Sequence, residues 1–374
     1  MAVSASSPGE RDGSVPPLRG LMRFSEAIAS EIFAFQRAAF PRRRADWIEP
    51  RWRWMFVASA ARLGVEPMVW VYRSKGRVVA HQGAIPVRLR TPVGEQVTGW
   101  FVETMALEEV RGKAIGPMVV AKAAQDLPFN LSLGQTEQMR ELQYRLGWQL
   151  VAPLETLIFV LNGGALVSRK VPRLMVPFAG VMLTLQQRAR HWYGRQPSGV
   201  PHEVREISSF SSAHDRLWQE VESHFKVAVV RDASYLNWKY VDQPGRSFVR
   251  LEITREGRVC AVAVISLSEP NATYPYRRAW LNDFVVRPDD EWLLWSLLEA
   301  VRQASLRLGA DMIVFDVISD TVARAAVGFG FVRRKPLRML LIAPGNPPTD
   351  AGRFALDASN WLVTRGDSDI DRPW

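Results

Sequence analysis

The sequence repeats one ordered set of landmarks about 180 residues apart. The matching segments, in chain order, are Trp52–Trp54 and Trp238–Tyr240, Gly76–Ala80 and Gly257–Ala261, Trp100 and Trp280, and Gly147 and Gly330. The last three pairs are separated by 181, 180 and 183 residues. A nearly constant offset with one order indicates an internal duplication. We therefore expect two copies of one fold in tandem.

Strands that alternate with helices in each copy predict a mixed α/β sheet. In the first copy, strands near 68–72, 78–85 and 100–107 precede an apolar helix near 117–125. A short strand, a second helix and a last strand at 156–161 follow. The expected segments are a disordered leader at 1–22, a first domain at 23–162, a connector at 163–203, a second domain at 204–343 and a tail at 344–374.

Composition limits the chemistry that the chain can use. The single cysteine, Cys260, excludes an intramolecular disulfide and a thiolate-rich zinc site. The five histidines show no spacing typical of metal ligands, so we expect no metal. No secretory signal is evident, and no window has the ~18 apolar residues of a membrane span. We expect a cytoplasmic protein without stable membrane insertion.

The net charge of +10 favours an anionic small molecule over nucleic acid. The only basic run, Arg42–Arg44, is too short for a nucleic-acid arm, and no nucleic-acid-binding motif is present. The apolar stretch Leu174–Leu185 is followed by Arg188 and Arg190. We expect it to form a helix packed between the domains, with attachment to a membrane surface as the alternative.

The segment Arg111–Gly116 connects a strand to an apolar helix. Such a junction offers free backbone N–H groups and the positive end of the helix dipole, which together suit a phosphate. Gly112 and Gly116 allow a ligand to approach the backbone closely, and Arg111 and Lys113 add positive charge. The alternative is a tight turn with two incidental glycines.

The strand ending at Met105–Val110, the loop Arg111–Gly116 and the turn Leu146–Trp148 resemble the GNAT superfamily of acyl-CoA-dependent acyltransferases. The loop is similar to that family's Arg/Gln-x-x-Gly/Ala-x-Gly/Ala pyrophosphate motif, with Ala114 where glycine is commonest. The likeness covers residues 24–161 well and 205–342 more faintly. It implies two tandem GNAT-like domains.

The second domain is expected to be degenerate. At the place that corresponds to the loop it has no glycine and carries three acids, Asp289, Asp290 and Glu291. Negative charges there oppose binding of a pyrophosphate. We therefore expect one cofactor site per chain, in the first domain.

The resemblance implies that acetyl-CoA or another acyl-CoA binds as a substrate. Backbone N–H groups from Val110 to Gly116 would hold its pyrophosphate, and one near Met105–Leu107 would polarise the thioester carbonyl. The preceding strand would diverge from its neighbour and pair with the pantetheine arm. The implied cofactor-binding residues are Met105, Ala106, Leu107, Val110, Arg111, Gly112, Lys113, Ala114, Ile115 and Gly116.

Three residues are candidates for proton transfer, which acylation of an amine requires. Glu103 lies on the strand that enters the loop, as a base or as a salt-bridged strand residue. His81 lies at the end of a central strand, as a base or as a structural histidine. The family often places a tyrosine acid at the position of Gln143, so Tyr144 is a candidate acid or a packing residue.

Three functions remain open at this point. The first is acyl transfer from acyl-CoA to an amine acceptor, a small molecule or sugar, by direct attack in the first domain. The second is a Fem-like aminoacyl transferase, which the glycine-bearing loop Arg111–Gly116 disfavours because that branch needs no pyrophosphate seat. The third is a non-catalytic module that binds acyl-CoA.

Overall fold

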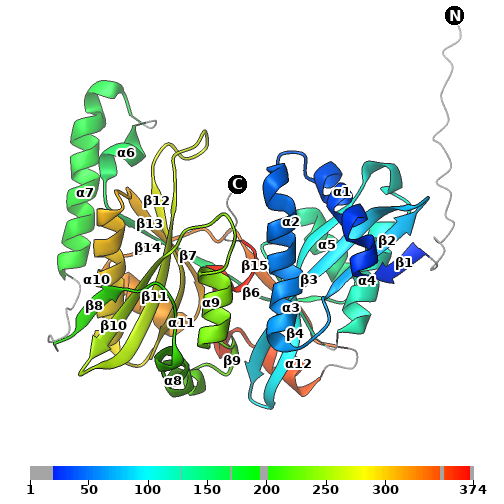
Figure 1. Ribbon diagram of the computed structural model, residues 1–374. Helices are drawn as coiled ribbons and strands as arrows, with labels where there is room; N and C mark the ends of the chain where they lie inside the picture. Colours follow the sequence, from blue (N-terminus) through cyan, green and yellow to red (C-terminus); the bar gives the residue numbers. More distant parts are fainter. Residues whose placement is uncertain (1–19, 128, 169–170, 194–200, 346–348, 371–374) are drawn as a thin grey trace, which may run out of the picture.

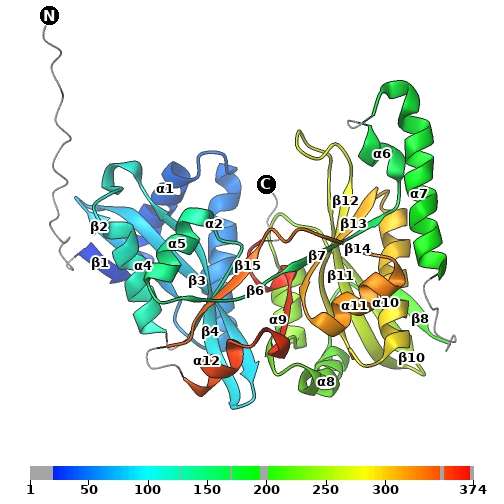
Figure 2. The same ribbon diagram turned by 180° about the vertical axis from the view of Figure 1, so that it is seen from behind.

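The computed structural model describes residues 20–127, 129–168, 171–193, 201–345 and 349–370. Two halves lie side by side (Figure 1), and Figure 2 shows the same arrangement from behind. We call residues 20–162 the N-terminal half and residues 203–343 the C-terminal half. Sixteen strands among the described residues form one continuous mixed sheet, which confirms the expected α/β class.

The N-terminal half has a sheet covered by helices on both faces. Its strands are β1 (Leu21–Arg23), β2 (Val69–Ser74), β3 (Arg77–Thr91), β4 (Gly94–Ala106), β5 (Asn130–Leu133) and β6 (Gln149–Pro153). Its helices are α1 (Ala29–Ala39), α2 (Ala45–Arg53), α3 (Ser59–Leu63), α4 (Ile115–Asp126) and α5 (Glu137–Arg145). Side chains alternate along β2: Val69 and Val71 pack in the cluster that contains α1, whereas Met68 and Trp70 pack with α4.

From β10 onward, the C-terminal half repeats the order of elements that the N-terminal half has from β2 onward: three strands, then a helix, a strand, a helix and a strand. Its strands are β8 (Glu203–Glu206), β9 (Val227–Val229), β10 (Val249–Arg255), β11 (Arg258–Ser268), β12 (Arg278–Val286), β13 (Met312–Ile318) and β14 (Val332–Arg334). Its helices are α8 (Ser212–Val221), α9 (Ala233–Tyr240), α10 (Glu291–Arg307) and α11 (Asp320–Phe329).

The two halves exchange one strand each. Strand β7 (Glu155–Val160) is the last strand of the N-terminal half in the chain but pairs with β13 and β14 of the C-terminal half. Strand β15 (Met339–Ala343) makes the reverse crossing and pairs with β5 and β6. Each half of the continuous sheet therefore contains a strand from the other half, and the halves are expected to unfold together.

A reciprocal pair of tryptophans joins the halves at the level of α2 and α9. The rings of Trp54 and Trp238 are stacked, with centroids 4.8 Å apart and planes 15° apart. The indole N–H of Trp54 donates to the Trp238 carbonyl over 2.8 Å, and that of Trp238 donates to the Trp54 carbonyl over 3.1 Å. This symmetric contact buries both polar N–H groups with a partner.

Two further segments lie outside the halves. The connector contains α6 (Gly163–Val167) and α7 (Val176–Tyr193), and the tail contains α12 (Asp350–Ala355), β16 (Trp361–Thr364) and the turn Arg365–Asp367. Helix α7 lies on the outer side of the C-terminal half, away from the N-terminal half (Figures 1 and 2). The expectation that this helix packs between the domains is wrong. Its apolar side chains face outward.

The strand exchange makes a directional prediction for Leu157, which is fully buried in β7. Leu157→Ala should lower the free energy of unfolding by about 2–5 kcal/mol, the usual cost of truncating a buried leucine. Because β7 pairs with β13 and β14, hydrogen exchange measured by mass spectrometry should accelerate in peptides from those strands. Acceleration confined to residues 20–162 would contradict the exchange. Leu340→Ala in β15 is the matched variant and should act on β5 and β6.

Candidate functional site

Strands β4 and β5 pair over only a short distance and then diverge. Among the described residues, their parallel pairing consists of Gly99 with Asn130 and Trp100 with Leu131. Strand β4 continues to Ala106, so its last six residues have no partner strand on the β5 side. Backbone N–H and C=O groups are strong hydrogen-bonding groups, and an unpaired edge of this length suits an extended ligand.

The predicted phosphate loop follows directly after this edge. Gly112 has a φ of +81°, a left-handed conformation that favours glycine, and a Cβ there would meet nothing within 4 Å. Ala114 caps α4 with a φ of +58°, which costs an alanine about 1–2 kcal/mol relative to a right-handed conformation. The loop therefore keeps the backbone shape that a glycine would adopt more easily.

The first turn of α4 presents backbone donors next to the unpaired edge. The turn itself uses the amides of Val110 and Arg111, which donate to Leu107 and Glu108 over 3.1 Å each. The N–H groups of Ile115 and Gly116 open the twelve-residue helix α4 and have no partner within it. With the helix dipole, these groups favour an anion at this end.

The backbone register distinguishes the three residues, Met105 to Leu107, of which one is predicted to donate its N–H to the thioester carbonyl. The Leu107 amide donates to the Val79 carbonyl over 2.9 Å, and Met105 pairs with His81. Since backbone groups alternate between the two sides of a strand, the amide of Ala106 points to the unpaired edge. Ala106 is thus the donor that faces the space between β4 and β5.

Glu103 occupies a bulge in β4. Two residues, Glu103 and Thr104, lie opposite Gln82 alone, and Glu103 has a φ of +57°. A bulge redirects side chains, and a non-glycine residue in this conformation is uncommon enough to mark a constrained position. The bulge turns the Glu103 carboxylate toward the face of the sheet that α1 and α2 cover.

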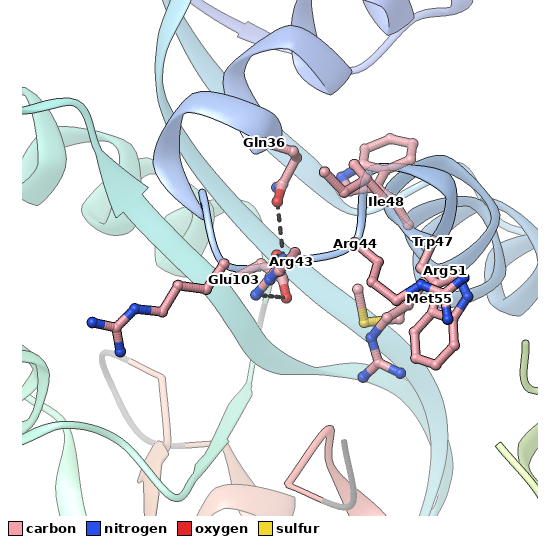
Figure 3. A pocket seen from close by; sticks show the side chains of 10 residues that line it. Gln36, Arg43, Arg44, Trp47, Ile48, Arg51, Met55 and Glu103 are labelled. Carbon is pink, nitrogen blue, oxygen red and sulfur yellow. Dashed lines mark hydrogen bonds and ion pairs between the residues drawn. The ribbon is translucent and has the colours of Figure 1, made fainter. Parts of the chain in front are cut away.

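The Glu103 carboxylate borders a cavity of about 300 Å³ (Figure 3). Arg43 donates to both carboxylate oxygens, over 2.6 and 2.8 Å, and also to Gln36 over 3.1 Å. A bidentate guanidinium–carboxylate pair holds the two groups in one plane. The complete lining is Gln36, Arg42, Arg43, Arg44, Trp47, Ile48, Arg51, Trp52, Met55 and Glu103.

His81 is buried directly behind Glu103 and does not line this cavity. Its Nδ1 lies 2.9 Å from the Glu103 carbonyl oxygen, and its Nε2 lies 3.2 Å from the Trp52 indole nitrogen. Since the indole N–H can only donate, Nε2 accepts and Nδ1 carries the proton. Burial lowers the pKa of His81, so the ring is neutral at neutral pH.

The third candidate, Tyr144, lies on the outer face of α5 with 44% of its surface exposed. The neighbouring Gln143 is buried and donates to the Ser132 hydroxyl of β5 over 2.9 Å. The geometry brings Glu103 and His81 together and leaves Tyr144 apart from the lining of the cavity. Among the described residues, no group of three His, Cys, Asp or Glu side chains is arranged as metal ligands.

The corresponding place in the C-terminal half is filled by the chain itself. Strands β12 and β13 pair in parallel as far as Leu281 and Phe315, and β16 then pairs with the continuation of β13. Gly366 of the tail lies against the Asn282 carbonyl, where a Cβ would come within 3.0 Å. Thr364 donates to Asp283 over 3.0 Å. Backbone and side chains of the tail thus occupy the space that stays open between β4 and β5.

An arginine–carboxylate pair recurs in this filled half. Asp283 lies 180 residues after Glu103, the offset that separates Trp100 and Trp280. Arg231, two residues before α9, donates to Asp283 over 2.9 Å, as Arg43, two residues before α2, donates to Glu103. Arg231 also binds Asp367 of the tail over 2.7 Å. The pair therefore contributes to the fold in both halves.

Sequence reasoning missed the arginines and Gln36 around the cavity. The run Arg42–Arg44 is evident in the sequence, but its pattern does not indicate that Arg43 pairs with a carboxylate at a cavity. Gln36 and Arg51 are the buried polar residues of α1 and α2, and the other polar residues of these helices are not buried. Arg51 in the second turn of α2 is only 4% exposed. This burial identifies it as a residue of the site, and burial cannot be read from the sequence.

The protein resembles known proteins in its structure but not in its sequence. No family model matches the sequence, and no curated protein matches it. A GCN5-related N-acetyltransferase from Anabaena variabilis is similar in structure, with a TM-score of 0.59 and 10% identity over 86% of this chain and 71% of that one. A probable N-acyltransferase from Enterococcus faecalis gives 0.57 and 8% over the same shares.

Saccharomyces cerevisiae N-myristoyltransferase with bound myristoyl-CoA is also similar. Its TM-score is 0.56, and the 11% identity extends over 96% of this chain and 95% of that one. At these identities the likeness shows the fold. The chain has the GNAT fold, and the coverage agrees with two GNAT-like copies in tandem.

The buried His81 makes a pH-dependent prediction. The folded protein keeps this ring neutral, whereas the unfolded chain protonates it near its ordinary pKa of about 6.5. Its contribution to stability is complete above that pH and is lost as the pH falls below it. Against His81→Gln, the wild type should lose up to about 1.4 kcal/mol more per pH unit below pH 6.5, by urea unfolding. Parallel pH profiles for the two proteins would show that His81 titrates normally when folded.

Proposed function

We propose that the protein is an acyl-CoA-dependent N-acyltransferase whose N-terminal half is catalytic. The observation that carries the proposal is the divergence of β4 from β5 immediately before a left-handed loop and the N-terminus of α4. An extended pantetheine arm and a pyrophosphate need these two features in this order. The GNAT fold of the solved structures supports the same function.

The proposed path of the acyl-CoA follows these two features. The pyrophosphate binds the amides at the start of α4, next to Lys113 and Arg111. The pantetheine arm lies along the unpaired edge of β4 and enters between β4 and β5. The amide of Ala106 then donates to the thioester oxygen and stabilises the negative charge that develops during attack.

The acceptor binds in the cavity beside Glu103. Its walls combine the apolar surfaces of Trp47, Ile48 and Met55 with arginines, so an amine that also bears a negative group and an apolar part fits best. Such an acceptor is a small molecule or a sugar derivative. The amine attacks the thioester carbon directly, the C–S bond breaks, and the thiolate of coenzyme A leaves.

Glu103 takes the proton of the attacking amine in this proposal. Its carboxylate borders the cavity in which the acceptor binds, and the bidentate contact with Arg43 fixes its orientation. His81 acts as a positioning residue, because its Nδ1–H holds the Glu103 carbonyl and its Nε2 is engaged by Trp52. Tyr144 is the proposed proton donor to the thiolate, and it lies outside the lining of the cavity.

Two other functions make different predictions for the same protein. A Fem-like aminoacyl transferase would not bind free coenzyme A through the loop Arg111–Gly116. A non-catalytic module would bind acyl-CoA but release no thiol with any amine. Single-turnover measurement of thiol release, with and without a panel of amines, therefore separates these functions.

Gly112→Asp tests the cofactor site. Aspartate places bulk and negative charge where the pyrophosphate binds, so coenzyme A affinity measured by calorimetry should fall at least about tenfold. Gly257→Asp is the matched control, because Gly257 has a φ of +75°, also has open space around its Cβ position and lies in the other half. Equal affinity in folded Gly112→Asp and Gly257→Asp proteins would refute the assignment.

Glu103→Gln tests the base. It preserves shape and removes charge, so turnover with the best amine of the panel should fall about 100- to 10,000-fold, the usual contribution of a positioned base. Coenzyme A affinity should not change, and the defect should lessen at high pH, where the amine is already deprotonated. Near-normal turnover at neutral pH would place the base elsewhere. A loss of stability without a specific loss of turnover would assign Glu103 the structural role that Asp283 has.

A further inference from the structure

Helix α7 exposes an apolar stripe along its whole length. Leu174, just before the helix, is 96% exposed, Phe178 is 69% exposed and Trp192 is 78% exposed. Successive helical residues are about 100° apart, so all members of the stripe lie on one side of the helix. The exposed members are Leu174, Met175, Phe178, Val181, Met182, Leu185 and Trp192. We call this set the α7 stripe.

The opposite side of α7 holds the helix to the protein through polar contacts. The Gly163 amide donates to the Thr184 hydroxyl over 2.9 Å, and Gln187 donates to the Gly330 carbonyl over 2.8 Å. His191 Nδ1 lies 2.9 Å from the Phe329 carbonyl oxygen, and its ring stacks on Trp295. The usual amphipathic arrangement is thus reversed, with polar groups inward and apolar groups outward.

An exposed apolar surface of this extent marks an interaction site in a globular protein. The stripe begins at Leu174 and ends at Trp192, which corresponds to about 27 Å at 1.5 Å per residue. The contacts of Thr184, Gln187 and His191 fix the helix, so the stripe cannot turn inward to bury itself. None of the described segments of the chain covers the stripe, which leaves it available to an outside partner.

Charge indicates what covers it. Residues 163–202 contain six arginines and lysines and no aspartate or glutamate. Arg188 and Arg190 are exposed within α7 itself. An apolar stripe with cationic flanks and no acidic residue complements a surface that is apolar below and anionic above.

We propose that α7 binds the surface of a lipid bilayer that contains anionic lipids, with the α7 stripe in the interface and the arginines at the headgroups. The helix lies in the plane of the membrane. None of the described helices has the length and apolarity to cross a bilayer. A second copy of the chain is a poorer occupant, because two-fold pairing of α7 would bring the two cationic segments together without acids to neutralise them.

Sedimentation with vesicles tests this proposal on the full chain. The wild type should sediment with phosphatidylcholine vesicles that contain a third phosphatidylglycerol, and far less with pure phosphatidylcholine. Phe178→Ser/Leu185→Ser removes two members of the stripe and should weaken binding at least about tenfold. Arg188→Gln/Arg190→Gln should weaken it about 25-fold, since each cation near an anionic surface contributes about 1 kcal/mol, or fivefold.

Leu337→Ser is the matched control. Leu337 is 72% exposed but lies outside α7, so its loss should leave vesicle binding unchanged. Failure of the wild type to bind anionic vesicles would overturn the proposal, as would equal binding by the Phe178→Ser/Leu185→Ser protein. A wild-type dimer that this variant converts to monomer, without vesicle binding, would assign the stripe to self-association instead. Circular dichroism confirms that each variant is folded.

Discussion

Two parallel strands that diverge leave backbone N–H and C=O groups without a strand partner. The two halves of this protein differ in what lies along those groups. In the C-terminal half, the tail enters between β12 and β13, adds β16 and closes the opening with Thr364 and Gly366. In the N-terminal half, none of the described strands pairs with the β5-facing edge of β4 after Trp100. The same backbone geometry is therefore a filled core in one half and a candidate ligand groove in the other.

The arginine–carboxylate pair of each half also differs in its surroundings. Arg231 and Asp283 are sealed beneath the tail, where Arg231 donates to Asp367 and Thr364 donates to Asp283. Arg43 and Glu103 make the same contact at the wall of a cavity. Fixing the entrance of a helix to the bulge of a strand is a structural function that both pairs perform. Any role of Glu103 in proton transfer is an addition to that function, made possible by the cavity.

The sequence was informative where a local pattern determines a local structure. The offset between Trp100 and Trp280 predicted the duplication, and the glycines of Arg111–Gly116 predicted a strand–loop–helix junction, which the structure has. The absence of glycine at Asp289–Glu291 predicted that the second copy lacks this loop. Asp290 instead caps α10 by accepting from the Leu293 amide over 2.9 Å.

Features that depend on distant contacts were not predictable. Nothing in 156–161 reveals that β7 pairs with strands of the other half, because a continuous apolar strand fits either neighbour. The bulge that places Glu103 beside Arg43 depends on a register shift, not on residue type. The apolar stretch Leu174–Leu185 has the composition of a buried helix, yet the polar residues Thr184 and Gln187 of α7 are the ones that face inward.

The number of coenzyme A molecules bound per chain tests the account most directly. Native mass spectrometry of the full chain, titrated with coenzyme A, should show one bound molecule at saturation, because the tail occupies the second opening. Deletion of the tail is unsuitable as a control, since Asp367 and Thr364 satisfy buried groups. The Gly112→Asp protein serves instead and should bind none at the same concentration. Two equivalent molecules per chain, or one that persists in Gly112→Asp, would contradict the account.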